Sequence, residues 1–234
     1  MVPQSDKVLR HILKMLSRYG VFSGRMGFIM MKTKITVLVS GGGTNLQALI
    51  DAQQSGIIHS GEISLVISDK PGVKALERAE KAGIATAIVP RSEYGKDIEG
   101  YGKALLKVLK ESGTELIVLA GFLTILSDEV VSAYPEKIIN VHPSLIPSFC
   151  GEGFFGLKVH EKALEYGVKV TGATVHFVSE VVDGGRIIAQ KAVDILDGDT
   201  PEILQRRVME NCEWIILPQA VEKVSKEIFD GKDL

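Results

Sequence analysis

The stretch KITVLVSGGGTNLQALIDAQQS, residues 34–55, contains a complete strand-turn-helix unit. Its first part, residues 34–40, is rich in β-branched side chains, which favours a β-strand. Three glycines then permit a tight turn, after which Leu46, Leu49 and Ile50 recur at the spacing of one helical face. A strand that leads through a glycine turn into a helix is typical of α/β proteins with a parallel sheet.

The alternation of strands and helices continues beyond this unit. Near-continuous apolar runs predict strands over residues 62–68, 84–90, 114–122 and 137–142. Amphipathic stretches predict helices over residues 72–83, 97–112 and, starting at Thr200 and Pro201, a long closing helix over 201–229. Two alternating stretches predict a paired set of strands over residues 169–180 and 185–195. We therefore expect a Rossmann-like, mostly parallel twisted sheet with helices on both faces and an antiparallel C-terminal portion.

The composition restricts the class of protein. The chain has 234 residues, of which 45% are hydrophobic and 24% charged, which suits one α/β domain with a sizeable core. A net charge of -2 argues against nucleic acid as a partner. Cys150 and Cys212 are the two cysteines and lie in no metal-ligand spacing, so we expect no disulfide and no metal, and a reducing, cytoplasmic setting. The sequence has no apolar run of about eighteen residues, so we expect no membrane partner.

The first part of the chain has a different character. Within it, VLRHILKMLSRYGVF, residues 8–22, shows a short amphipathic pattern with basic residues between the apolar ones. A basic surface helix, a partner-binding segment and a targeting arm all have this pattern, whereas a secretory signal would need a longer apolar run. We treat residues 1–33 as an N-terminal extension of unknown role and residues 34–234 as the functional domain.

The glycine turn SGGGTN, residues 40–45, is the first candidate site. A helix N-terminus offers unpaired N–H groups and positive potential, and glycines let an anion approach the backbone closely. The turn lacks the spacing of a dinucleotide fingerprint and the lysine of a P-loop. Two interpretations stay open: a phosphate site, or a plain strand-to-helix turn capped by Thr44 or Asn45.

A second candidate site joins Asn140 and His142, at the end of a predicted strand, with Asp183 in the segment SEVVDGG. Residues two apart in a strand point to the same side, so the asparagine and histidine would be presented together. An amide can donate to a carbonyl that gains negative charge, a histidine can stabilise the oxyanion or move protons, and a carboxylate can orient that histidine. The three residue types therefore suit acyl transfer without a protein nucleophile, although a strand cap, a buried histidine and a turn residue would also explain them singly.

Four segments together resemble the glycinamide ribonucleotide formyltransferase family: VLVSGGGTNLQALIDA, LAGFLTILS, NVHPSLIPSF and VTGATVHFVSEVVDGGRIIAQ. The resemblance implies a formyltransferase fold and an enzyme of purine (IMP) biosynthesis. That enzyme would transfer the formyl group of 10-formyltetrahydrofolate to the amine of glycinamide ribonucleotide, by direct attack through a tetrahedral intermediate. The resemblance also implies roles for the trio: Asn140 polarises the formyl oxygen, His142 stabilises the oxyanion, and Asp183 holds the histidine and relays protons.

The same resemblance implies binding residues. The substrate phosphate and ribose portion would contact Gly43, Thr44, Asn45 and Glu213. The folate would contact two segments, Leu123, Thr124, Ile125 and Leu126 in the first and Ser179, Glu180, Val181 and Val182 in the second. For Leu126 in particular, a core-facing position at the end of the strand stays an alternative. The cation for the folate tail is either Arg91 or Lys96, and the oligomeric state is a monomer or a homodimer.

The chain departs from the family pattern in three places. Thr124 stands where arginine is common, so a charge contact to folate would be lost, and Arg186 stands where proline is common, which leaves the turn less rigid. The segment SFCGEGFFG, residues 148–156, is longer than the usual form and places Cys150 where proline is common. Its glycines and phenylalanines suggest a lid that excludes water from the formyl carbon. Packing of the phenylalanines on a helix starting near Leu157, or at a subunit contact, is the alternative.

Three other functions fit less of the sequence. Methionyl-tRNA formyltransferase usually has HASLLP where this chain has HPSLIP, and it adds a tRNA domain. Formyltetrahydrofolate hydrolase has a second histidine where Pro143 stands, and an N-terminal regulatory domain. A binding module without activity would keep the glycine turn but would not need Asn140, His142 and Asp183 together.

Overall fold

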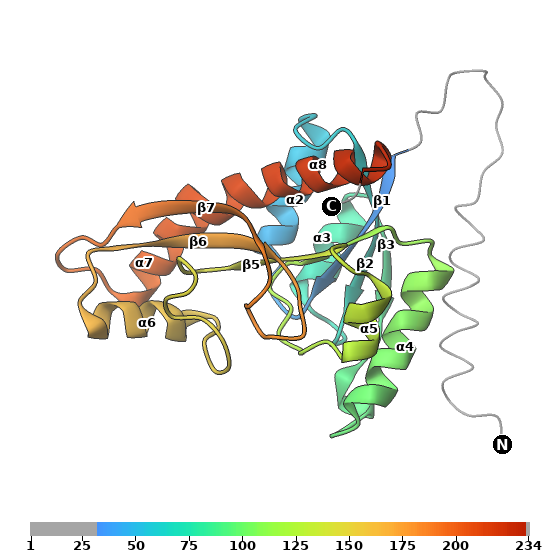
Figure 1. The fold of residues 1–234 in the computed structure, drawn as a ribbon, viewed down its shortest axis with the longest axis horizontal. Helices are drawn as coiled ribbons and strands as arrows, with labels where there is room; N and C mark the ends of the chain where they lie inside the picture. The colour runs from blue at the N-terminus through green and yellow to red at the C-terminus, as the bar shows by residue number, and fades with distance from the viewer. Residues whose placement is uncertain (1–31, 233–234) are drawn as a thin grey trace.

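The computed structural model describes residues 32–232 of the chain (Figure 1). Most of the N-terminal extension, residues 1–31, therefore lies outside the described residues, and the division of the chain at residue 33 stays a prediction. The described part contains one seven-stranded sheet in the order β3-β2-β1-β4-β5-β6-β7. The strands are β1 Thr33–Val39, β2 Gly61–Ser68, β3 Ala85–Ile88, β4 Leu116–Leu119, β5 Ile138–His142, β6 Val170–Phe177 and β7 Ile187–Asp194.

The sheet confirms the predicted mixed topology. The first five strands of the sequence pair in parallel, and β6 and β7 add antiparallel to β5 and to each other. Together β6 and β7 extend the sheet beyond its parallel part (Figure 1). Strand β4 is shorter than the predicted 114–122, because the chain turns at Gly121, whose φ of 71° lies in the left-handed region. The parallel strands end at one edge, where ligands bind in such sheets.

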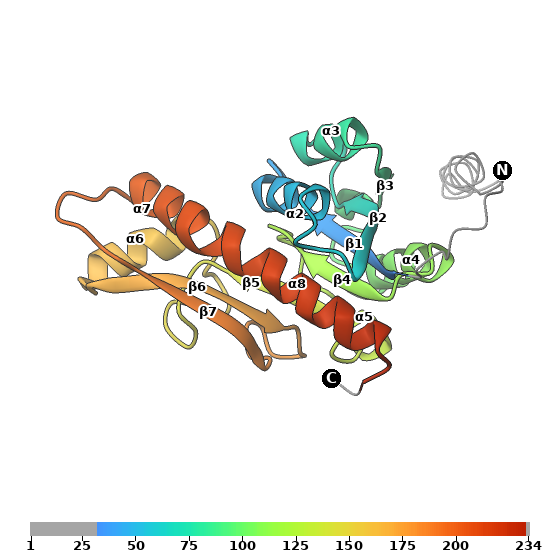
Figure 2. The ribbon, with the colours of Figure 1, turned by 90° about the horizontal axis from the view of Figure 1, so that it is seen from above.

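Helices cover both faces of the sheet (Figure 2). One face packs against α2 Thr44–Gln54, α3 Lys74–Lys81, α7 Pro201–Val208 and α8 Trp214–Phe229, and the other against α4 Ile98–Glu111 and α5 Asp128–Ala133. Helix α6 Leu157–Tyr166 packs beside α7, and a 3-10 turn spans Arg91–Glu93. The sequence patterns predicted neither the 3-10 turn nor the short helix α5. The six residues of α5 are too few for a helical period to be recognised.

The predicted closing helix exists but contains a π-helical turn. Thr200 caps α7 by accepting a hydrogen bond from the Ile203 N–H, and Pro201 occupies the first turn, as predicted. The π turn Met209–Glu213 then joins α7 to α8. A π turn inserts one extra residue per turn and shifts the side chains that follow, and such turns recur at functional sites. Here the turn ends on Glu213, whose side chain is buried.

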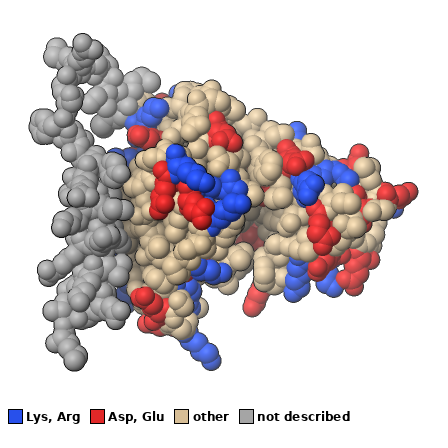
Figure 3. All heavy atoms as spheres, turned by 180° about the vertical axis from the view of Figure 1, so that it is seen from behind, with Lys and Arg blue, Asp and Glu red and all other residues tan. Residues whose placement is uncertain are grey.

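Charged side chains of both signs are interspersed over the face that Figure 3 shows. This distribution is consistent with the small net charge of -2. Among residues 32–232, no helix is both long and apolar enough to span a membrane.

Candidate active site

The predicted trio meets at the carboxyl edge of the sheet. Asn140 and His142 lie on β5, two residues apart, and the strand continues to His142, so both point to the same side. His142 is buried and Asn140 is partly exposed. Asp183 arrives on the loop between β6 and β7, and its Oδ2 lies 3.4 Å from His142 Nδ1. The structure therefore brings together three residues that the sequence separates by about forty positions.

The loop geometry explains the glycines after Asp183. Asp183 has a φ of 55°, a left-handed conformation that aspartate tolerates better than most residues. A side chain on Gly185 would run into the carbonyl oxygen of Phe177 at the end of β6. The backbone at Gly185 must therefore pass directly over the end of β6. This close approach holds the Asp183 carboxylate against β5. Its Oδ2 also accepts a hydrogen bond of 2.8 Å from the Gly151 N–H.

A fourth polar residue, His176, belongs to this cluster. It lies on β6 directly opposite Asn140 in the antiparallel pairing, and it is buried. Its Nε2 lies 3.2 Å from Asn140 Nδ2 and 3.5 Å from Asp183 Oδ1. The sequence analysis missed His176, because only the register between β5 and β6 shows that it faces Asn140.

Two backbone carbonyl groups determine the tautomers of the histidines. His142 Nε2 lies 2.9 Å from the oxygen of Phe149, and His176 Nδ1 lies 2.8 Å from the oxygen of Phe177. A carbonyl oxygen only accepts, so each of these nitrogens carries the proton in a neutral ring. In a neutral ring His142 Nδ1 is then bare, and both this nitrogen and His176 Nε2 face Asp183. A further proton on either ring would lie beside a carboxylate.

Burial and the neighbouring charges shift the pKa values. Burial lowers the pKa of His142, and Asp183 and the Phe149 carbonyl oppose this only in part. Burial alone would raise the pKa of Asp183, but contacts with His176, His142 and the Gly151 N–H outweigh it and hold that pKa below its ordinary value. Near neutral pH the site therefore contains a carboxylate and a neutral His142.

His160 on α6 is a further histidine that the sequence analysis missed. It is fully buried, and neither of its ring nitrogens has a hydrogen-bond partner. Burial, together with the nearby His142, lowers its pKa to about 4, so it stays neutral. His160 therefore adds no charge to the cluster.

The glycine turn lies near the same edge, at the start of α2. Gly43 occupies the N-cap position with a φ of 71°, and the helix has no side-chain cap, so neither Thr44 nor Asn45 caps it, as the alternative interpretation of the turn required. Instead Asn45 Nδ2 donates a hydrogen bond of 2.7 Å to Glu213 Oε2. Thr44 is exposed, and its hydroxyl lies 3.9 Å from Met209 Sδ. The four predicted substrate residues therefore lie together, although Glu213 comes from the far end of the chain.

The carboxyl group of Glu213 has an unusual environment. Burial raises the pKa of Glu213 from 4.5 to about 7, and the bond from Asn45 opposes this only partly. Asn45 Oδ1 is buried next to it without a partner. A buried carboxyl and an unpaired amide oxygen can both bind hydroxyl groups, which suits a sugar.

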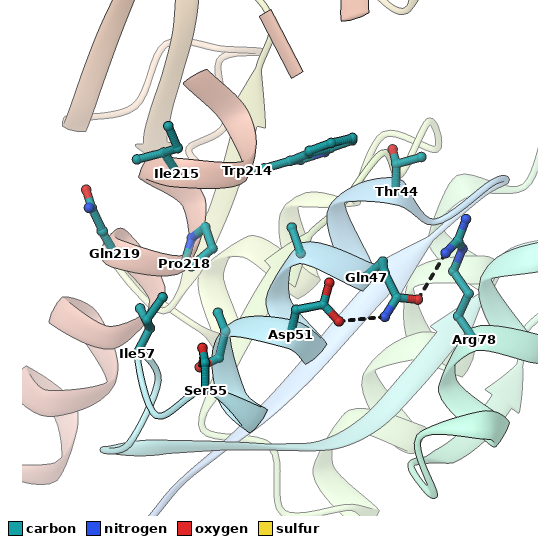
Figure 4. Close-up of a pocket in the computed structure, with 12 residues that line it drawn as sticks. Thr44, Gln47, Asp51, Ser55, Ile57, Arg78, Trp214, Ile215, Pro218 and Gln219 are labelled. Atoms are coloured by element: carbon teal, nitrogen blue, oxygen red, sulfur yellow. Dashed lines mark hydrogen bonds between the residues drawn. The ribbon is translucent and has the colours of Figure 1, made fainter. Parts of the chain in front are cut away.

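A cavity of about 610 Å³ opens between α2 and α8 beside this turn (Figure 4). Polar side chains of α2 line one wall, and Trp214, Ile215 and Pro218 line the other. Arg78 at the mouth donates to the carbonyl oxygen of Gly42 and to Gln47 Oε1. The indole N–H of Trp214 is buried without a partner. The volume is sufficient for a small molecule.

The two predicted folate segments are largely exposed and apolar. Leu123 and Ile125 are 55% and 59% exposed, and Val181 and Val182 are 68% and 42% exposed. Large apolar side chains that face solvent beside polar groups are typical of a ligand cleft. Leu126 is different, because it packs in the core with α4 and α5, the alternative left open for it.

The other predicted folate residues make local contacts. Thr124 donates a hydrogen bond of 2.7 Å to Asp69 Oδ2, so the threonine ties its segment to the end of β2. Ser179 Oγ lies 3.1 Å from the carbonyl oxygen of Val181, and Glu180 is exposed. Neither candidate for the folate tail is singled out: Arg91 stacks over Tyr101 at 5.4 Å, and Lys96 is exposed.

The lengthened loop 148–156 contacts His142 and Asp183 directly. It supplies the Phe149 carbonyl to His142 and the Gly151 N–H to Asp183. The Phe149 ring packs against Tyr166 of α6 with centroids 6.0 Å apart, whereas Phe155 is 57% exposed. At the neighbouring turn, Arg186 pairs with Glu136 and lies 4.5 Å over the Phe177 ring, so it restrains the turn where proline is common.

Within residues 32–232, no group of three or more His, Cys, Asp or Glu side chains is arranged to hold a metal ion.

Known proteins resemble this chain over most of its length. A trifunctional purine biosynthetic protein adenosine-3 from Gallus gallus is 47% identical over 83% of the chain, and the chain spans only 18% of that protein. A chloroplastic phosphoribosylglycinamide formyltransferase from Arabidopsis thaliana is 37% identical over 76% of the chain and 61% of that protein. A crystal structure of glycinamide ribonucleotide transformylase 1 from Symbiobacterium toebii is 38% identical, with a TM-score of 0.78, over 88% of this chain and 93% of that one. Residues 33–221 match the family described as formyl transferase, and the chain belongs to that family.

Proposed function

We propose that this chain transfers the formyl group of 10-formyltetrahydrofolate to the amine of glycinamide ribonucleotide. The observation that carries the proposal is the meeting of Asn140, His142 and Asp183 at the sheet edge, beside a glycine turn that Glu213 completes. Relatives named for this reaction support the choice of substrates. The apolar, exposed segments around Leu123 and Val181 fit a flat folate ring system.

The bound formyl folate would supply an electrophilic carbon. The amine of the second substrate attacks that carbon, so a new C–N bond forms and the formyl oxygen gains negative charge. Asn140 donates a hydrogen bond to this oxygen, and His142 donates a second one from Nε2. In the present conformation the Nε2 proton is bound to the Phe149 carbonyl, so the loop 148–156 must release it. Collapse of the oxyanion then breaks the bond to the folate nitrogen.

The reaction moves one proton from the amine to the folate nitrogen. His142 Nδ1 is bare and faces Asp183, so it can hold that proton between the two steps. The carboxylate stabilises the resulting imidazolium, which offsets the burial that lowers the pKa of His142. Asp183 therefore acts through the charge of its carboxylate and through the orientation of the ring.

The glycine turn and Glu213 would bind the ribonucleotide. The N-terminal N–H groups of α2 can hold its phosphate, and Glu213 with Asn45 can bind ribose hydroxyl groups. The cytoplasmic location predicted from the sequence stays a prediction, since the Arabidopsis relative is a chloroplastic form. A monomer or homodimer likewise stays a prediction.

A turnover assay tests the proposal. The purified chain is mixed with 10-formyl-5,8-dideazafolate and glycinamide ribonucleotide, and release of the deformylated folate is followed by absorbance. We expect release that depends on the ribonucleotide, and formylated ribonucleotide in the product by mass spectrometry. A folded chain that releases formate instead, with or without ribonucleotide, would contradict the proposal and indicate a hydrolase.

A further inference from the structure

We propose that Asp69 is a positioning residue, which holds the predicted folate segment 123–126 against the end of β1. The inference rests on the proposed formyl transfer and adds a residue to the binding of its folate. Asp69 directly follows β2 and is 2% exposed, so it touches no ligand itself. It acts through two hydroxyl groups, those of Ser40 and Thr124.

The backbone of Asp69 is fixed between two neighbouring strand ends. Its N–H donates a hydrogen bond of 3.3 Å to the carbonyl oxygen of Val39, at the end of β1. Its carbonyl oxygen accepts one of 2.9 Å from the Arg91 N–H, beyond the end of β3. A carboxylate buried at such a place needs donors from the protein, because little water reaches it. Asp69 is therefore a fixed acceptor at the edge where ligands bind in such sheets.

Two hydroxyl groups connect this acceptor to the folate segment. Asp69 Oδ2 accepts hydrogen bonds of 2.9 Å from Ser40 Oγ and 2.7 Å from Thr124 Oγ1. Because the Ser40 proton is directed to Asp69, the lone pairs of Ser40 Oγ remain as acceptors, and Oγ accepts a bond of 2.9 Å from the Leu123 N–H. Asp69 therefore holds Thr124 directly and Leu123 through the orientation of the Ser40 hydroxyl.

The bond from Thr124 explains which side chains of the segment face the cleft. Thr124 is partly buried, whereas Leu123 and Ile125 on either side of it are 55% and 59% exposed. This alternation is that of an extended chain, in which successive side chains point to opposite sides. An inward Thr124 therefore turns Leu123 and Ile125 outward, towards the flat ring system of the folate.

The competing role for Asp69 is to hold the glycine turn that would bind the ribonucleotide. That turn has anchors of its own, because the carbonyl oxygens of Gly41 and Gly42 both accept hydrogen bonds from α3. The segment 121–126 differs, since its hydrogen bonds to the rest of residues 32–232 are the two that depend on Asp69. Loss of Asp69 should therefore displace the folate segment and leave the glycine turn in place.

Two substitutions of Asp69 and one control separate this role from general stability. Asp69→Asn keeps an oxygen that can accept from both hydroxyl groups, and its amide nitrogen takes the place of Oδ1, which has no hydrogen-bond partner within residues 32–232. Asp69→Ala removes the acceptor. Thr36→Val is the matched control, because it also removes a buried hydroxyl bond, of 2.7 Å to Thr114. That bond lies before β4, whereas the folate segment follows β4.

Calorimetric titration with 10-formyl-5,8-dideazafolate and, separately, with glycinamide ribonucleotide measures both affinities without turnover. We expect Asp69→Ala to weaken folate binding roughly tenfold or more, the usual effect of losing a hydrogen bond to a charged acceptor, and ribonucleotide binding by less than about threefold. Asp69→Asn should stay within about threefold of the parent for both ligands. Thr36→Val should lower the melting temperature and change neither affinity.

Three results of the titrations would overturn the inference. The first is an equal loss of both affinities in Asp69→Ala, which would indicate a general structural role. The second is parent-like folate binding in that variant. The third is an asparagine variant as weak as the alanine variant, because the oxygen that accepts the two hydroxyl groups would then not be what holds the segment.

A second measurement needs no ligand, so it distinguishes failure of the inference from failure of the proposed function. Hydrogen exchange of the Leu123 amide, followed by NMR, reports its bond to Ser40 in the ligand-free protein. We expect faster exchange in Asp69→Ala and parent-like exchange in Asp69→Asn. Unchanged exchange in Asp69→Ala would overturn the inference even if formyl transfer is observed. A parent chain that binds no folate analogue, but whose Leu123 exchange depends on Asp69, would overturn the proposed function alone.

A further variant keeps the test open if Asp69→Ala does not fold. Ser40→Ala leaves the carboxylate in place and removes the acceptor of the Leu123 N–H. It should likewise speed exchange at Leu123 and weaken binding of the folate analogue more than binding of the ribonucleotide. A Ser40→Ala variant with parent-like exchange and folate affinity would overturn the inference.

Discussion

The two ends of the site differ in how their buried polar atoms are satisfied. At the β5 end, the side-chain nitrogens and oxygens of His142, His176 and Asp183 all contact polar partners within the protein. At the α2 end, Asn45 Oδ1 and Trp214 Nε1 are buried and have none. Unpaired buried polar atoms cost stability, and they bind a ligand that pairs them. Under the proposed function, the comparison teaches that the trio is paired within the protein in advance, whereas the unpaired atoms at the α2 end are left for the ribonucleotide.

The largest expected effect is on the β5 end of the site. Replacing His142 or Asp183 by alanine should lower turnover by roughly two powers of ten or more, because acid–base and oxyanion contributions are each commonly of that size. Substrate affinity should change less, since neither side chain belongs to the glycine turn. Steady-state kinetics on folded variants measures both. Near-parent turnover in either variant would contradict the proposal that Asn140, His142 and Asp183 act together in formyl transfer.

The substitution Glu213→Gln tests the α2 end of the site through the pH dependence of stability. Burial raises the pKa of Glu213 from 4.5 to about 7, so the folded state binds its proton more tightly than the unfolded state. The contribution of this carboxyl group to the free energy of unfolding is therefore full below pH 4.5. It is lost as the pH rises towards 7, and the loss is roughly 3 kcal/mol at most.

The carboxamide of the glutamine has nearly the same shape as the carboxyl group of Glu213, but it does not titrate in this pH range. Denaturant unfolding should therefore show the parent losing stability relative to Glu213→Gln as the pH rises through that window. Parallel curves for the two proteins would show that Glu213 is not buried as described. In the assay, the same variant should raise KM for the ribonucleotide more than it lowers kcat.

The glycine turn offers a matched pair of substitutions. The side chain of an alanine at 43 would meet Ala75 of α3, with a Cβ–Cβ distance of 2.7 Å, and the φ of 71° is unfavourable for it. Gly43→Ala should therefore cost roughly 1–3 kcal/mol of stability.

An alanine at 42 behaves differently, because its Cβ would meet nothing within 4 Å. Gly42→Ala should leave stability nearly unchanged while weakening ribonucleotide binding, since the new methyl group projects into open space at the turn. Calorimetric titration and thermal unfolding check both variants. Equal stability of the two would contradict the geometry of the turn.

The smallest expected effect concerns the loop 148–156. Phe155 is 57% exposed here, so it gains burial only if the loop closes over bound ligands. Phe155→Ser should raise folate hydrolysis relative to formyl transfer a few-fold, roughly the effect of losing one apolar contact, without changing the melting temperature. An unchanged ratio, or a different oligomer size, would favour the alternative of a packing or subunit-contact loop.

Much of the fold could be predicted from the sequence, because each strand and long helix has a clear period. The trio could be predicted too, since Asn140 and His142 lie at a strand end and Asp183 precedes two glycines. His176 could not, because its partner depends on the register of two antiparallel strands. The direction of the Gly43 Cβ, towards Ala75 rather than a ligand, likewise depends on the packing of α3.

The central claim is that the β5 end of the site carries the reaction and the α2 end binds the ribonucleotide. One set of progress curves tests it. Formylated ribonucleotide is measured for the parent, Asp183→Asn and Glu213→Gln across a range of ribonucleotide concentrations. We predict a large loss of kcat with little change in KM for Asp183→Asn, and a raised KM with most of kcat retained for Glu213→Gln. Loss of the same parameter in both variants would contradict the claim.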